Sequence, residues 1–283
     1  MKSRLVIHAI LNLTGKYEEE PMTTRRTVLA AGLSAAAVAT SVTSANAQTA
    51  QKTFVLVHGA WHGGWCWRRV ADALQRRGHK VFTPTLTGLG ERSHLMSRDI
   101  NLDTHITDVV NVFKWEELKD AVLVGHSYGG WVISGVAEQV LPRVRSIVFL
   151  DAFMPDDGTR GLDNTSAFSR KGILAALEKG DVSRPSPTAA MFEVNEKDRS
   201  WVDSKTTPQP VGVALQPIRL TGARDRVTKK TYIRAASYPQ PIFDKYLAIC
   251  KADRTWRTFE IPCGHDVMVD MPERLAEVLV EVA

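Results

Sequence analysis

A serine stands between glycines in the stretch G-H-S-Y-G, residues 125–129. It directly follows the apolar run Ala121–Gly125 and precedes a run of small residues, so the stretch matches G-x-S-x-G in a strand–turn–helix setting. A side chain at either glycine would collide with neighbouring backbone in such a turn. The pattern predicts that Ser127 is a nucleophile. The alternative is a glycine-rich helix start with an inert serine.

A histidine suited to activate this serine lies in C-G-H-D, residues 263–266, after the last strand-like run. The order serine, acid, histidine along the chain places the base last. His265 could take the Ser127 proton and return it to a leaving group. Four other histidines lie in expected loops or helices without this setting, namely His62, His79, His94 and His105. The side chain of His126 is expected to point away from the nucleophile.

The stretch H-G-A-W, residues 58–61, follows the first strand-like run. Acyl transfer places negative charge on a carbonyl oxygen, which two backbone N–H groups can stabilise. We expect Ala60 and Tyr128 to supply them, because the Tyr128 amide lies at a helix start where donors are unpaired. His58 is expected to bond its own turn rather than to act as a base.

Strand-like and helix-like runs alternate along the chain, which predicts an α/β fold with a parallel sheet covered by helices on both faces. Ligands in such sheets bind beyond the carboxyl ends of the strands. The expected strands are 53–58, 80–84, 121–125, 146–151, 231–235 and 258–261.

One segment, about 155–216, breaks the alternation, since it is rich in Gly, Pro, Ser, Thr and charge, with a helical stretch near 172–179. A connection this long is usually functional or has helices of its own. We interpret it as a small lid inserted over the sheet. A disordered excursion is the alternative.

Residues 1–47 have the features of an export signal. Arg25 and Arg26 precede a mildly apolar, alanine-rich stretch, and Ala45-Asn46-Ala47 matches a cleavage site. The paired arginines and weak hydrophobicity are typical of the twin-arginine route. Met22 could be the true start. We therefore expect a periplasmic or secreted protein with one domain over residues 48–283.

Composition narrows the class of partner. The net charge of +5 falls to about +3 without residues 1–47, and no cluster of basic and aromatic residues indicates nucleic acid. No metal-ligand spacing is present, and neither a metal nor an organic cofactor is expected. The body of the chain has no apolar run long enough for a membrane span, so we expect no stable membrane insertion after signal removal. The sequence leaves open a monomer or a homodimer, and a Cys250–Cys263 bridge or free buried thiols.

Together these motifs resemble the α/β-hydrolase superfamily. The chain is most similar to the branch of plant hydroxynitrile lyases, small methyl esterases and bacterial esterases. F-V-L-V-H-G-A-W, P-T-L-T-G-L-G-E-R-S-H, G-H-S-Y-G-G and G-H-D-V-M carry the resemblance, which covers about 54–282. It implies an α/β-hydrolase fold with about six mainly parallel strands.

The triad acid is the main departure from that branch. Its usual place, A-A-S-Y-P-Q-P at residues 235–241, contains no carboxylate. Some lipases of the superfamily place the acid after the strand that follows the nucleophile helix, where this chain has Asp151. We therefore predict Asp151 as the acid, with Asp156 and Asp225 as alternatives. Asp266 is expected to point elsewhere.

A second departure concerns the reaction. The lyases of that branch need a hydroxyl residue and a lysine where this chain has Gly59 and Asp266. We therefore predict a serine hydrolase that cleaves small to medium carboxylic esters, aryl or apolar, through an acyl-enzyme. Trp61, Trp131 and Phe153 are expected to line its pocket, core packing being the alternative for each. A lactonase, a carbon–carbon bond hydrolase and a non-catalytic ligand receptor remain alternatives.

Overall fold

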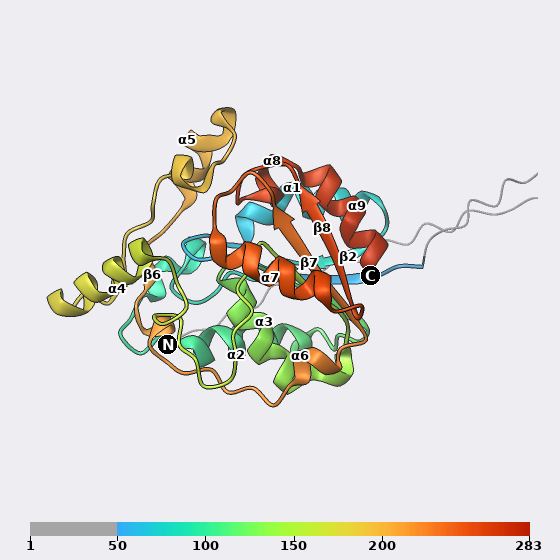
Figure 1. Cartoon of the computed structure of the whole chain (residues 1–283), viewed down its shortest axis with the longest axis horizontal. Coiled ribbons are helices and arrows are strands. Elements are labelled where there is room, and N and C mark those ends of the chain that lie inside the picture. Colours follow the sequence, from blue (N-terminus) through green and yellow to red (C-terminus); the bar gives the residue numbers. More distant parts are fainter. Residues whose placement is uncertain (1–49) are drawn as a thin grey trace, which may run out of the picture. The chain divides into compact units, whose positions relative to one another are not determined.

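The computed structural model describes residues 50–283, and the proposed export signal lies outside them. A six-stranded sheet forms the centre of this part of the chain, in the order β2-β1-β3-β4-β7-β8 (Figure 1). Every neighbouring pair is parallel. The strands are β1 (Thr53–Val57), β2 (Lys80–Phe82), β3 (Ala121–His126), β4 (Val144–Leu150), β7 (Lys229–Ala235) and β8 (Trp256–Ile261).

Helices cover both faces of the sheet because the central strands are apolar on both sides. One set of alternating strand residues, including Leu56 and Val124, packs with α1 (Arg68–Arg76), α8 (Val267–Asp270) and α9 (Pro272–Val282). The other set, including Val55 and Leu123, packs with α2 (Leu102–Trp115), α3 (Gly129–Val140) and α7 (Pro241–Ala252). The expected fold is therefore confirmed, with a sheet that is wholly parallel.

The segment between β4 and β7 contains the part interpreted as a lid. Three α-helices and a two-stranded antiparallel sheet lie between β4 and β7, and Figure 1 shows α4 and α5 to one side of the large sheet. Its elements are α4 (Ala167–Lys179), β5 (Ser183–Arg184), η4 (Ala189–Phe192), α5 (Glu196–Lys205), β6 (Gln209–Pro210), η5 (Gly212–Ala214) and α6 (Ala223–Arg226). Short 3₁₀ turns elsewhere are η1 (Gly64–Trp67), η2 (Gly90–Leu95) and η3 (Leu141–Arg143).

One strand end differs from the expectation, and the structure decides between the two alternatives for the cysteines. β2 ends at Phe82, two residues before Pro84, because proline lacks the N–H that a strand ladder uses. The three cysteines, Cys66, Cys250 and Cys263, are buried free thiols, so no Cys250–Cys263 bridge is present. Within residues 50–283, no helix is long and apolar enough to cross a membrane, and no cluster of metal-ligating side chains occurs.

Candidate active site

Ser127 occupies a tight turn between β3 and α3, with a positive φ of 53° that side chains rarely adopt. The close packing around this turn leaves no room for a side chain at either flanking glycine. A Cβ at Gly125 would lie 2.7 Å from the Gly129 carbonyl oxygen, and one at Gly129 would lie 2.9 Å from that of His58. The turn therefore forces the serine to the carboxyl end of the central strand, where ligands of parallel sheets bind.

The structure brings His265 and Asp151 together. His265 follows β8, Asp151 follows β4, and the His265 Nδ1 lies 2.6 Å from the Asp151 Oδ2. Both side chains are buried. The other candidate acids, Asp156 and Asp225, line a separate hollow with Glu138 and do not contact His265.

With Nδ1 held by Asp151, Nε2 is the ring nitrogen that His265 can offer to the serine. Ser127 and His265 line the same pocket. Residues 50–283 contain no hydrogen bond between them, and such bonds are often long in ligand-free enzymes.

Arg234 is part of this cluster, and sequence reasoning missed it. It lies on β7, between β4 and β8, and its Nη1 donates to the Asp151 Oδ1 over 2.8 Å. The same oxygen accepts the Ala235 amide at 3.1 Å, and Arg234 Nε donates to Asp244. Burial alone would lower the pKa of Arg234, but Asp151 and Asp244 outweigh it and raise the pKa. The sequence feature that could have indicated this role is an arginine inside the apolar run T-Y-I-R-A, residues 231–235, because a buried charge needs a partner.

The loop that lacks the usual carboxylate contributes an aromatic ring instead. Tyr238 stacks on His265 with ring centroids 4.5 Å apart. On other sides of the imidazole, Phe243 lies 5.7 Å away and His126 lies 4.4 Å away. These rings and Asp151 restrict the imidazole to one orientation.

His126 lies against His265 instead of lining the pocket. Its Nε2 pairs with the His265 carbonyl oxygen over 3.0 Å. Burial, followed by the neighbouring His265, lowers the pKa of His126 well below its ordinary value. His126 is therefore neutral and adds no charge beside His265.

Neither of the two amides expected to stabilise an oxyanion donates a hydrogen bond within the described part of the chain. They belong to Ala60 and Tyr128, which both line the pocket. The residue after Ala60, Trp61, has a φ of 65°. Its N–H donates to Gln209 Oε1 over 2.8 Å, and its carbonyl accepts the Thr207 amide over 2.9 Å. The Ala60–His62 loop is thus held by β6 and by the residues just before it.

A second buried pair supports the same loop. His62 Nε2 lies 3.0 Å from Asp266 Oδ2, and His62 Nδ1 lies 2.8 Å from the Ala60 carbonyl oxygen. Burial opposes ionisation of Asp266, but His62 outweighs it and lowers the pKa of Asp266 to about 2. No sequence pattern distinguishes His62 from the other loop histidines, because its partner Asp266 lies 204 residues away. As expected, Asp266 points away from the pocket.

Two further histidines are structural. His58 Nδ1 contacts the Gly59 carbonyl oxygen at 2.8 Å, which confirms the expected bond to its own turn. Its Nε2 accepts the Leu86 amide, and burial lowers its pKa to about 3. His105 lies 3.1 Å from the Tyr128 hydroxyl and fixes that ring at the wall of the pocket.

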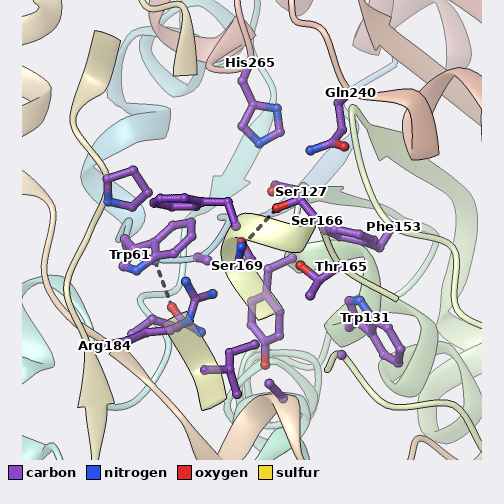
Figure 2. A pocket seen from close by; sticks show the side chains of 18 of the residues that line it. Trp61, Ser127, Trp131, Phe153, Thr165, Ser166, Ser169, Arg184, Gln240 and His265 are labelled. Carbon is purple, nitrogen blue, oxygen red and sulfur yellow. Dashed lines mark hydrogen bonds between the residues drawn. The ribbon is translucent and has the colours of Figure 1, made fainter. Parts of the chain in front are cut away.

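The pocket above Ser127 encloses about 890 Å³, counting its open mouth (Figure 2). The three residues expected to line it do so, namely Trp61, Trp131 and Phe153. Further apolar walls come from the segment between β4 and β7, with Phe168, Ile173, Phe192 and Val213. The structure thus joins a serine, a histidine and a carboxylate below a largely apolar pocket whose aromatic walls suit an aryl or apolar group.

This fold and this site define the class of protein. Residues 54–278 match the alpha/beta hydrolase family, and the chain belongs to that family.

Particular relatives narrow the class. The chain is 43% identical over 240 residues to the carbendazim hydrolyzing esterase of Nocardioides sp. (strain SG-4G), covering 80% of this chain and 97% of the relative. It is 35% identical to methylesterase 10 of Arabidopsis thaliana, covering 81% of this chain and 91% of the relative. These relatives confirm the predicted enzyme class, a carboxylic ester hydrolase.

A solved structure agrees with this assignment. An extracellular alpha/beta-hydrolase from a Paenibacillus species superimposes with a TM-score of 0.70 at 27% identity, covering 82% of this chain and 99% of that one. Its description reports structural and functional homology to tobacco salicylic acid binding protein 2.

Proposed function

We propose that this chain is a cofactor-independent serine esterase in which Ser127, His265 and Asp151 act as a catalytic triad. The observation that carries the proposal is the 2.6 Å contact between His265 and Asp151 at the pocket that Ser127 lines. A histidine oriented in this way keeps the tautomer in which Nε2 can accept a proton.

The reaction follows from these positions. Ser127 Oγ attacks the ester carbonyl carbon, and His265 Nε2 takes the hydroxyl proton. The C=O electron pair moves onto oxygen, where the Ala60 and Tyr128 amides stabilise it. Collapse of this intermediate breaks the ester C–O bond, and His265 returns the proton to the departing alcohol. Water, deprotonated by His265, then releases the acid and restores Ser127.

The pocket and the relatives support small to medium esters with an aryl or apolar group. Aromatic walls formed by Trp61, Trp131 and Phe153 suit such groups. Hydroxynitrile cleavage is disfavoured, because a Cβ at position 59 would lie 2.9 Å from His126 Nδ1 and Asp266 faces His62.

The decisive test is substitution of the nucleophile. Ser127→Ala should lower kcat for aryl esters by about 10⁴-fold or more, with unchanged folding by circular dichroism. A fluorophosphonate probe should label the wild-type protein and leave Ser127→Ala unlabelled. An unlabelled wild type would favour the receptor alternative, and a panel of esters, lactones and β-diketones of graded size separates the hydrolase alternatives.

We also propose export through the twin-arginine route, from the sequence of residues 1–47. Protein recovered from native cells should begin near Gln48. Intact residues 23–47 on the mature protein would contradict the proposal.

A further inference from the structure

The pocket contains one permanent charge that the reaction does not use. Arg184, on β5, is the only Lys, Arg, Asp or Glu among the described residues that line it. Its guanidinium carbon lies 4.2 Å from the centroid of the Trp61 ring, beside which Figure 2 shows it. Trp61 directly follows Ala60, so this cation lies in the wall next to the expected oxyanion loop.

Arg184 has no polar partner among the residues that the structure describes. Within residues 50–283 its side chain makes neither a hydrogen bond nor an ion pair, and its one polar-type contact is the stacking on Trp61. Burial lowers the pKa of Arg184 to about 10, and nothing nearby offsets this effect. A partly buried guanidinium without an anion is costly, so a bound anion would stabilise it.

A second unpartnered donor lies directly across the strand pair. Gln209 on β6 is the Cα partner of Arg184, lines the same pocket and is 1% exposed. In the carboxamide of Gln209 only the oxygen can accept a hydrogen bond, so Gln209 must turn its Oε1 to the Trp61 N–H. The Gln209 Nε2 is consequently left as a donor, and it is buried with no hydrogen-bond partner in the described part of the chain.

Two donors, one of them charged, face a pocket without a carboxylate of its own. We propose that Arg184 and Gln209 form a subsite for a carboxylate of the ligand, so that the preferred substrate is an ester that also carries an ionised carboxyl group. This inference rests on the proposed function. A carboxylate satisfies both donors and the charge, whereas a neutral carbonyl satisfies only the hydrogen bonds. The aromatic walls would hold the apolar part between the ester and the carboxylate.

Binding measured by calorimetry tests the subsite without requiring turnover. The ligands are 3-phenylpropanoate and 4-phenylbutanoate, each compared with its neutral primary amide. The wild-type protein should bind the carboxylates about 10- to 100-fold more tightly than the amides, as expected for a charge-assisted hydrogen bond. In Arg184→Met, which keeps the apolar length, this preference should disappear. Arg184→Lys should restore part of it, because it keeps a charge without the planar fork.

Gln209→Glu tests the second donor, because it keeps the oxygen that the Trp61 amide needs. It should abolish the carboxylate preference by placing a negative charge in the subsite. Arg254→Met is the control matched to Arg184→Met, because it removes the same charge from an exposed residue outside the pocket. It should leave the preference unchanged.

Kinetics connects the subsite to catalysis. The 4-nitrophenyl monoesters of glutarate and adipate should show a higher kcat/KM than their methyl-capped neutral counterparts, mainly through a lower KM. Arg184→Met should bring the ratio close to one. Equal binding of carboxylates and amides, or a preference that survives in Arg184→Met, would overturn the inference. Absence of turnover with both ester types, together with a retained binding preference, would instead count against the proposed esterase.

Discussion

Replacing Asp151 by asparagine removes one charge and reverses one hydrogen bond. Asp151 accepts from His265 Nδ1, from Arg234 and from the Ala235 amide. In Asp151→Asn the Oδ1 can still accept from Arg234 and Ala235, so the Nδ2 must face His265. An amide N–H donates to Nδ1, which places the imidazole proton on Nε2, and His265 then cannot accept the Ser127 proton.

The expected loss in kcat is about 10³- to 10⁴-fold, which corresponds to about 4–5.5 kcal/mol of transition-state stabilisation. The loss of folding stability should be smaller, about 1.5–3 kcal/mol for one charge-assisted hydrogen bond. Arg234 limits this loss because it keeps Asp244 and the carbonyl oxygens of Ala235 and Tyr238 as partners.

Steady-state hydrolysis of a 4-nitrophenyl ester measures the first quantity, and urea unfolding followed by tryptophan fluorescence measures the second. Asp156→Asn and Asp225→Asn serve as controls, since neither carboxylate contacts His265. A kcat within about threefold of wild type in Asp151→Asn, or a collapse of kcat in Asp225→Asn alone, would refute the assignment.

Two further predictions concern stability. A Cβ at Gly130 would lie 2.0 Å from the Phe153 carbonyl oxygen, so Gly130→Ala should destabilise the fold by about 2 kcal/mol or more in urea unfolding. Gly172 lies within α4 with open space beside it, so Gly172→Ala should instead stabilise the fold by about 0.5–1 kcal/mol. Because the pKa of Asp266 is lowered to about 2 beside His62, the stability that its ionisation contributes is complete above its ordinary pKa and is lost as the pH falls from about 4 through 2. The stability difference between wild type and Asp266→Asn should shrink over that interval, and a constant difference would contradict it.

The sequence predicted the sheet, the tight turn around Ser127 and the position of His265 after the last strand, because each depends on a local pattern. Strand runs, a G-x-S-x-G turn and a histidine after the last strand are visible within a few residues. The placement of Asp151 followed from the missing carboxylate at 235–241 and from the rule that neighbouring strands end at the same edge of a sheet.

The contacts that the sequence did not indicate join residues far apart in the chain. Arg234 and Asp151 are 83 residues apart, and Gln209 and Trp61 are 148 residues apart. Such pairs depend on the register of β4 against β7 and on the path of the segment between them, which no short pattern encodes. The arginine inside the apolar strand 231–235 was overlooked, and nothing close to it in the sequence identifies its partner.

The hydrogen bonds that Thr207 and Gln209 make with Trp61 limit how the substrate preference of such an enzyme can be changed. The stretch of chain that lines the pocket with Phe168 and Phe192 also holds the backbone of Trp61, next to the Ala60 amide of the proposed oxyanion hole. Grafting this stretch from a relative would therefore carry over a new preference only if the two anchoring contacts came with it. A graft without these contacts would lower kcat as well as selectivity. The segment therefore cannot be exchanged independently of the catalytic site.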